Sequence, residues 1–206
     1  VLVDGAIMRL FSAVYEGPGV AWSSARLPAV HSRETVEFLR KFAAQTRRLG
    51  DLCDHYTTSE MWHETKAQQD GTIRRENRYA TRPEEWVVQG PHFYVGSPLA
   101  KTPDEGCSSH RAYTEIDLGG IPDDYWPRTN YLPACDVVSY EQRVPEWNQR
   151  KLTTSYRHVH RAMIAPGDRR TLISAIVPPG SAHVHSVMSV AFNSTCLLVD
   201  FSALTA

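Results

Sequence analysis

Two pairs of histidines, each with one residue between them, are the part of the sequence best suited to chemistry. They are His158 with His160 and His183 with His185. Side chains two residues apart on a β-strand point to the same face, so each pair would present two imidazole nitrogens to a metal ion. The carboxylate that such sites usually add is not close in the sequence. A small metal-dependent enzyme is therefore one hypothesis, and hydrogen-bonded or surface histidines are the alternative.

The motifs of the common enzyme classes are absent from the sequence. It has no glycine-rich phosphate or dinucleotide loop, no nucleophile elbow and no H-E-x-x-H zinc motif. The four cysteines are widely spaced and form no C-x-x-C pair, which favours free thiols in a reducing compartment over zinc binding or disulfides. No apolar run is long enough for a membrane span, and no signal peptide is evident. We expect a cytoplasmic protein with no membrane partner and no metal.

Charge is distributed unevenly along a chain whose overall formal charge is −1. Residues 143–170 hold seven basic and two acidic side chains, a net charge of +5. Residues 104–126 hold six acidic side chains and one basic, a net charge of −5. A nearly neutral protein binds a polyanion through such local basic patches. A second basic segment, near the middle of the chain, contains Arg74, Arg75 and Arg78.

The elements that would position these residues follow from periodicity and turn residues. Ser32 is a good N-cap, and apolar residues at helical spacing follow it until shortly before Gly50, which predicts a helix. From Trp86 onward, β-forming residues alternate with glycine and proline, as is typical of strands and turns. We therefore predict an α+β protein with a helical or irregular part, residues 1–85, and a β-rich part, residues 86–206. The β-rich part should contain a mixed, mostly antiparallel sheet, and the two parts could form one continuous domain.

Residues 156–180 are predicted to form a hairpin with a cationic strand and an apolar strand. Arg157 and Arg161 share one face of the first strand, and a turn leads into the apolar run 172–177. This run stops at Pro178, because proline cannot donate to a β-ladder. We interpret the run as a central strand of a packed sheet. The arginines are then either solvated or available to an anionic polymer.

The same segment, RHVHRAMIAPGDRRTLISAIVPPG, resembles part of the target-recognition region of type IIG restriction–modification enzymes and related N6-adenine DNA methyltransferases. The methyltransferases of BREX- and DISARM-like phage-defence systems belong to this group. The segment VVQGPHFYVGSPLAKTP also resembles family segments, so the likeness covers roughly residues 86–200. Family members often carry Asn-Glu before the Arg-Thr, whereas Gly167, Asp168 and Arg169 stand there in this chain.

The resemblance implies that the chain binds double-stranded DNA and gives sequence specificity to a methyltransferase catalytic domain or subunit. The N-P-P-Y/F tetrapeptide and the S-adenosylmethionine motif of that family are missing. We therefore expect a fragment or subunit that is not catalytic on its own, with S-adenosylmethionine bound in a separate catalytic domain. A protein–protein docking module of a defence complex is a further alternative. The candidate DNA-binding residues are Arg157, Arg161, Arg169, Arg170, Lys151, Arg74, Arg75 and Arg78.

Overall fold

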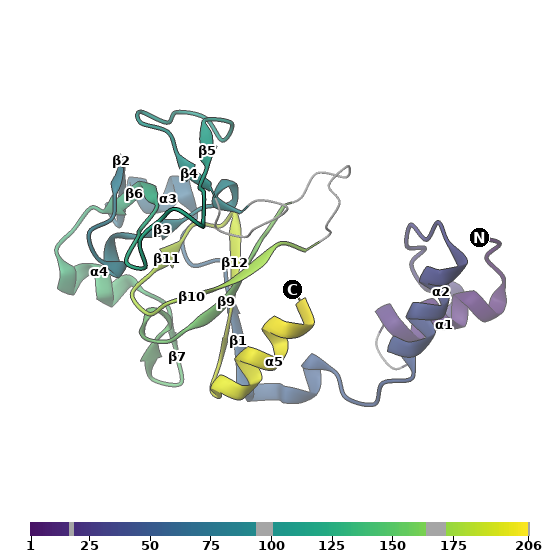
Figure 1. Cartoon of the computed structure of the whole chain (residues 1–206). Coiled ribbons are helices and arrows are strands. Elements are labelled where there is room, and N and C mark those ends of the chain that lie inside the picture. Colours follow the sequence, from purple (N-terminus) through teal and green to yellow (C-terminus); the bar gives the residue numbers. More distant parts are fainter. Residues whose placement is uncertain (17–18, 94–100, 164–171, 206) are drawn as a thin grey trace. The chain divides into compact units, whose positions relative to one another are not determined.

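The chain divides into two compact units in the structure, a computed structural model (Figure 1). The described residues are 1–16, 19–93, 101–163 and 172–205. The first unit is Val1–Cys53 and the second is Asp54–Ala206. The position 85/86, where the sequence suggests a change from helical to β-rich structure, lies inside the second unit. Residues 54–85 supply two strands to that unit, and these strands pair with segments much later in the chain.

The first unit is a pair of α-helices with a small apolar core. Helix α1 (Gly5–Tyr15) begins after Asp4, whose carboxylate accepts two backbone N–H bonds of 2.9 Å. Helix α2 (Arg33–Ala43) begins after Ser32, whose hydroxyl accepts from a backbone N–H, so the predicted helix and its N-cap are confirmed. Two short 3-10 helices are η1 (Trp22–Ser24) and η2 (Leu49–His55), the second of which runs into the other unit. The core consists of Leu10, Phe11, Ala25, Val36 and Leu39.

A four-stranded antiparallel sheet forms the base of the second unit, in the order β1-β12-β9-β10. Its strands are β1 (Tyr56–Ser59), β12 (Val187–Phe192), β9 (Arg157–Arg161) and β10 (Ser174–Val177). Helix α5 (Thr195–Thr205) packs on β9, β10 and β12 (Figure 1). The predicted hairpin is confirmed, since β9 and β10 pair with Ala175 opposite Val159. Strand β10 ends directly before Pro178, as expected.

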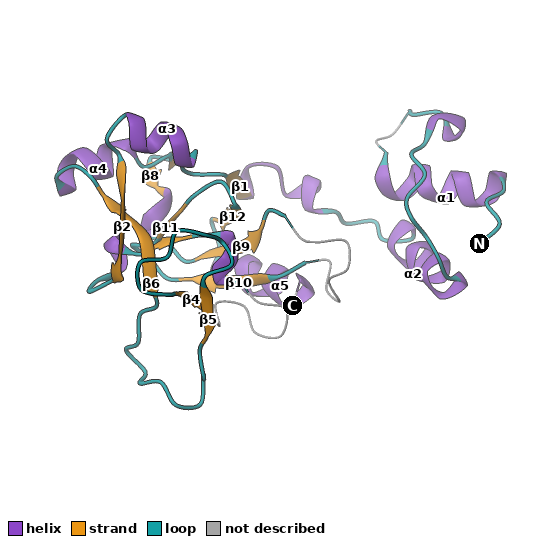
Figure 2. Cartoon of the chain, turned by 90° about the horizontal axis from the view of Figure 1, so that it is seen from above, coloured by secondary structure: helices purple, strands orange, loops and turns teal. Residues whose placement is uncertain are grey.

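Among the described residues of the second unit, the remaining elements are four two-stranded pairs and two short helices, together with 3-10 turns. Figure 2 shows how helices and strands are distributed. The pairs are β2 (Ile73–Tyr79) with β6 (Arg128–Pro133), β3 (Val87–Val88) with β11 (Ala182–His183), β4 (Lys101–Pro103) with β5 (Tyr113–Glu115), and β7 (Glu146–Trp147) with β8 (Arg150–Lys151). The helices are α3 (Glu64–Gln69) and α4 (Val137–Arg143), and the 3-10 turns are η3 (Pro83–Glu85), η4 (Gly90–His92) and η5 (Leu152–Thr154). Only β3 and β11 run parallel among these described pairs, so the predicted α+β class with mostly antiparallel sheets is confirmed.

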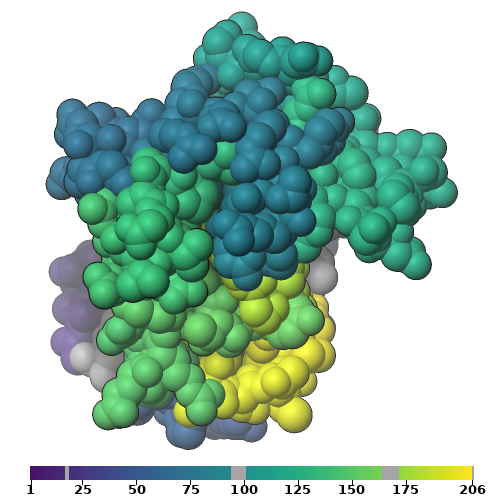
Figure 3. All heavy atoms as spheres, turned by 90° about the vertical axis from the view of Figure 1, so that its left-hand side faces the viewer, coloured from purple at the N-terminus to yellow at the C-terminus, as the bar shows by residue number. Residues whose placement is uncertain are grey.

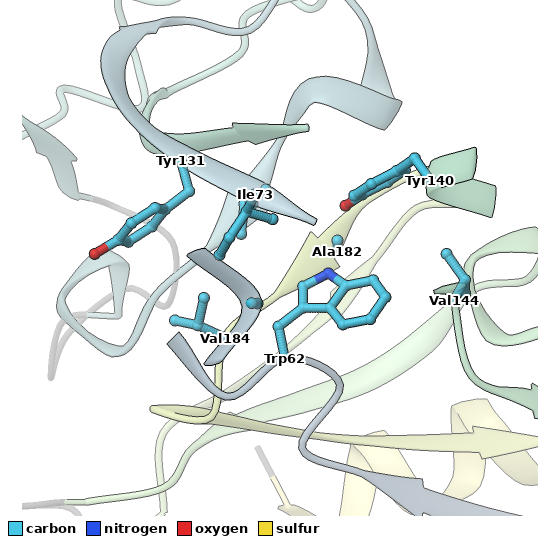
Figure 4. Packing of buried hydrophobic residues seen from close by; sticks show 9 residues of the cluster. Trp62, Ile73, Tyr131, Tyr140, Val144, Ala182 and Val184 are labelled. Atoms are coloured by element: carbon cyan, nitrogen blue, oxygen red, sulfur yellow. The ribbon is translucent and has the colours of Figure 1, made fainter. Parts of the chain in front are cut away.

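Two apolar clusters hold the second unit together. One surrounds Trp62 and Tyr140 between α3, α4 and the β3–β11 pair (Figure 4). The other surrounds Trp86 and Val159, beneath the four-stranded sheet. The connection from β5 to β6, residues 116–127, stands out from this packed body (Figure 2 and Figure 3). Its aspartates, Asp117, Asp123 and Asp124, are exposed, so much of the acidic segment is solvated.

The placement of strand β10 corrects one expectation from the sequence. The apolar run is not a central strand, because β10 lies at the edge of the sheet and β9 lies inside it. Ile176 is accordingly 42% exposed, whereas the next residue, Val177, is 1% exposed and belongs to the cluster around Trp86.

None of the described helices combines the length and apolar character needed to cross a membrane.

Candidate functional site

A pocket of about 490 Å³ lies in the second unit, lined by the β2–β6 pair and by residues of the loops and strands around it. Its size is within the range of small-molecule sites. Six of its polar side chains come from several different elements. They are Glu64 in the first turn of α3, Arg75 in β2, Gln89 between β3 and η4, Asn130 and Tyr131 in β6, and Arg161 at the end of β9.

An irregularity in the β2–β6 pair shapes one wall of this pocket. Arg75 pairs with Tyr131 and Arg78 pairs with Thr129, so two residues of β2 lie opposite the single residue Asn130. A bulge of this kind changes the direction in which the neighbouring side chains of the strand point. Here it brings the amide of Asn77 to 2.8 Å from Asn130 Oδ1.

A chain of amide hydrogen bonds fixes the orientation of Gln89. The backbone N–H of Gly106 donates to Asn77 Oδ1, so Asn77 Nδ2 is left to donate to Asn130 Oδ1. Asn130 Nδ2 then donates to Gln89 Oε1 at 3.1 Å, and the Tyr113 hydroxyl donates to the same oxygen. Burial raises the pKa of Tyr113, which keeps that hydroxyl protonated. Gln89 Nε2 is therefore a donor, it has no partner among the described residues, and Gln89 lines the pocket.

Glu64 supplies the pocket's carboxylate. The hydroxyl of Tyr131 donates to Glu64 Oε1, and it points away from the apolar cluster that holds the ring (Figure 4). Burial, together with the neighbouring carboxylate, raises the pKa of Tyr131, so the phenol remains a donor. The backbone N–H of Glu64 donates to His185 Nδ1 at 3.2 Å, and the His185 ring stacks on His63 with centroids 4.7 Å apart. The second oxygen of Glu64 stays available as an acceptor.

Two of the predicted DNA-binding arginines, Arg75 and Arg161, line this same pocket. Arg75 Nη2 donates to the backbone oxygen of Cys107 at 2.9 Å. The stem of Arg161 passes close to Gly90, where an added Cβ would lie 3.5 Å from Arg161 Cγ and 3.1 Å from the backbone oxygen of Ser186. Glycine at position 90 thus permits the close approach of these segments. Within the described part of the chain, neither arginine forms an ion pair with a carboxylate.

The other predicted residues lie elsewhere in the second unit or outside the described residues. Arg74 and Arg78 both pair with Glu76, and Arg78 also pairs with Glu85. Lys151 Nζ donates to two backbone oxygens at the end of α4 and forms an ion pair with a glutamate, 2.7 Å away. Arg169 and Arg170 fall outside the described residues, as does the turn before them.

Arg157 is not on a cationic surface, which corrects the expectation that it shares a solvent-facing side with Arg161. Its side chain is fully buried, and Nη2 donates to the backbone oxygen and the hydroxyl of Ser181. Nε and Nη1 have no partner among the described residues. Burial lowers the pKa of this guanidinium to about 10. Strand β9 is covered on both faces along residues 157–159, where successive side chains are all buried.

The histidine pairs do not assemble into a metal centre in the described part of the chain. No group of three or more histidine, cysteine, aspartate or glutamate side chains is placed to hold an ion there. His183 is buried and hydrogen-bonds Ser189 Oγ at 2.8 Å, while His185 stacks on His63. His158 lies beneath α5, with its ring 4.8 Å from that of Phe201. The pairs therefore serve packing and local hydrogen bonding in this arrangement.

Acid should weaken the fold through these buried histidines before it protonates most carboxylates. Burial lowers the pKa of His183 to about 3 and of His158 to about 4. An unfolded histidine binds a proton near pH 6.5, whereas the folded one does not, so stability is lost as the pH falls below that value. Each such histidine adds a loss that approaches about 1.4 kcal/mol per pH unit once the pH is well below 6.5. Melting between about pH 7 and about pH 5 measures the slope.

The matched variants for that measurement are His183→Gln and His110→Gln. Glutamine retains a hydrogen-bonding group near Ser189 but cannot gain a charge, so His183→Gln should flatten the acid side of the profile. His110 is exposed, and its replacement should leave the slope unchanged. An unchanged slope in His183→Gln would show that this ring does not carry the pH dependence.

Comparison of the chain with protein-family models, with curated proteins and with solved structures finds no match.

Proposed function

We propose that the second unit binds double-stranded DNA and is the target-recognition portion of an adenine-specific DNA methyltransferase or restriction–modification protein. The resemblance of residues 156–180 to such regions supports this assignment. The observation that carries it is the convergence of Arg75 and Arg161, 86 positions apart in the sequence, on one pocket beside the unpaired amide donor of Gln89. Neither arginine has a carboxylate partner among the described residues. Arg75 Nη2 donates to a backbone oxygen, and the other guanidinium N–H groups of the two arginines can bind phosphate or a base edge.

The catalytic step belongs, in this proposal, to another domain or subunit. That part would hold S-adenosylmethionine and the flipped adenine. The partners of this chain are then duplex DNA and the methyltransferase catalytic domain, and its place of action is the cytoplasm. Restriction–modification or phage defence is the process in which such a unit works.

Binding to duplex DNA should be weak for the isolated chain and should fall steeply with salt. If about four phosphates are contacted, the logarithm of the affinity falls against the logarithm of the salt concentration with a slope near −3.6. Fluorescence anisotropy with a labelled duplex at several salt concentrations measures this. Absence of binding in dilute buffer, or binding insensitive to salt, would contradict the proposal and favour a protein–protein docking module.

The arginines of the pocket should matter more than the arginines held in ion pairs. Arg161→Ala should weaken DNA binding by about 1 to 3 kcal/mol and leave the melting temperature nearly unchanged. Arg74→Ala is the matched control, because Glu76 already neutralises that side chain. If Arg74→Ala weakens binding as much as Arg161→Ala, DNA does not lie over the pocket.

A further inference from the structure

The pocket offers hydrogen-bond donors and a carboxylate acceptor together, which restricts the ligands it can hold. The donors are Gln89 Nε2 and the guanidinium groups of Arg75 and Arg161. The acceptors are both oxygens of Glu64, because Oε1 keeps a second lone pair beside its bond from the Tyr131 hydroxyl. The two arginines outweigh the single carboxylate, so the pocket admits an anionic backbone near the arginines, whereas beside Glu64 it requires N–H donors rather than acceptors. A neutral, planar ligand with acceptor atoms on one edge and N–H groups on another satisfies both sets.

Among the nucleobases, guanine fits this combination best. Its N7 and O6 are adjacent acceptors, which arginine binds as a bidentate pair. Its N1–H and N2 amino group are adjacent donors and match a carboxylate in the same bidentate way. Adenine and cytosine each offer one amino group, and thymine offers a single N–H, so none gives the carboxylate two donors side by side.

The glutamine amide adds a neutral donor to the pocket. Gln89 lines the pocket, and its Nε2 has no hydrogen-bond partner among the described residues, so it is open to a ligand. The series of hydrogen bonds from Gly106 through Asn77 and Asn130 fixes the orientation of the Gln89 amide, so its oxygen and nitrogen cannot exchange places. A ligand acceptor such as O6 would satisfy it.

We propose that this pocket binds one unpaired guanine base, and this inference rests on the DNA-binding function proposed above. The base must be unpaired, because N1–H and the N2 amino group are occupied in a Watson–Crick pair and are then closed to Glu64. The guanine would therefore be turned out of the duplex, as enzymes acting on bases do with their targets. The arginines and Gln89 take its N7–O6 edge, and Glu64 takes its N1–N2 edge.

The test compares duplexes that carry one bulged nucleotide, dG, dA, dC or dT, with the fully paired duplex. The bulged dG duplex should bind about tenfold more tightly, or better, than the other three bulges. The nucleotide dGMP should compete with the bulged dG duplex only at far higher concentration. Binding of dGMP as tight as that of the bulged duplex would show that a free nucleotide, not DNA, is the ligand.

The variant Glu64→Gln identifies the pocket as the source of the preference. Glutamine keeps an oxygen for the Tyr131 hydroxyl but replaces the other oxygen by a donor. The preference for bulged dG should disappear, whereas total DNA affinity should hold or rise because a negative charge is removed. Glu141→Gln is the control, since Glu141 is exposed and lies outside this pocket.

The outcomes separate this inference from the DNA proposal. If no duplex binds in a salt-dependent manner, both fail. If duplexes bind but all bulges bind equally, DNA binding stands and the guanine assignment is wrong. A dG preference that survives Glu64→Gln also overturns it, since the preference would then arise elsewhere on the protein.

Discussion

Val177→Asp is expected to unfold the second unit at room temperature, whereas Ile176→Asp should leave it folded. The two residues are neighbours in the same apolar run. Val177 is 1% exposed and packs in the cluster around Trp86 and Val159, so a carboxylate there would be buried without a partner. That penalty is several kcal/mol, and the lost apolar burial adds roughly 2 kcal/mol. A total stability of about 5 to 15 kcal/mol leaves little after such a loss.

Ile176 faces a different environment because successive side chains of a strand point to opposite faces of the sheet. The side chain is 42% exposed, and an aspartate at that position can reach water. The expected cost of Ile176→Asp is about 1 kcal/mol. Circular dichroism and thermal melting on the two variants measure the difference. Equal destabilisation would mean that both faces of β10 are buried.

Local signals predicted the elements that depend on local interactions. The helix after Ser32 follows from its N-cap and periodic apolar residues, both of which act within a few positions. The β9–β10 hairpin follows from two strand-like runs and a turn, and its end follows from Pro178. These features need no knowledge of distant segments.

The position of each strand within the sheet could not be predicted in the same way. The alternation of side chains along β9 places Arg157 and His158 on opposite faces of the sheet. It does not show which elements cover each of these faces. The pairing of β9 with β12 joins segments about 30 residues apart, and this pairing makes β9 internal and β10 an edge. An apolar run therefore became an edge strand, and a basic residue became part of the interior.

The pocket was only partly predictable. Arg75 and Arg161 stood out by charge, but nothing local shows that they line one cavity. Gln89 and Asn130 are single amides in ordinary strand sequences, and their importance appears only when β3 and β6 come together. The bulge in β2 leaves no signal in the sequence beyond a polar stretch.

Arg157→Ala should destabilise the second unit by about 2 to 5 kcal/mol without changing the salt dependence of DNA binding. Truncation leaves a cavity in a closely packed region, and it removes the donor to the backbone oxygen of Ser181. Arg157→Met should be at least about 2 kcal/mol more stable than Arg157→Ala, because methionine fills most of the space. It also removes a buried cation that has no carboxylate partner among the described residues.

Melting curves and DNA titrations on both variants distinguish an interior role from a DNA contact. If Arg157 belongs to the interior, the salt slope of the wild type persists in Arg157→Met, and its affinity changes little. A phosphate contact would instead lower the slope by about one unit in both variants. If Arg157→Met melts like the wild type and yet loses one unit of slope, the arginine leaves the interior to reach DNA. That result would restore Arg157 to the basic surface and would require β9 to be uncovered on one face when DNA binds.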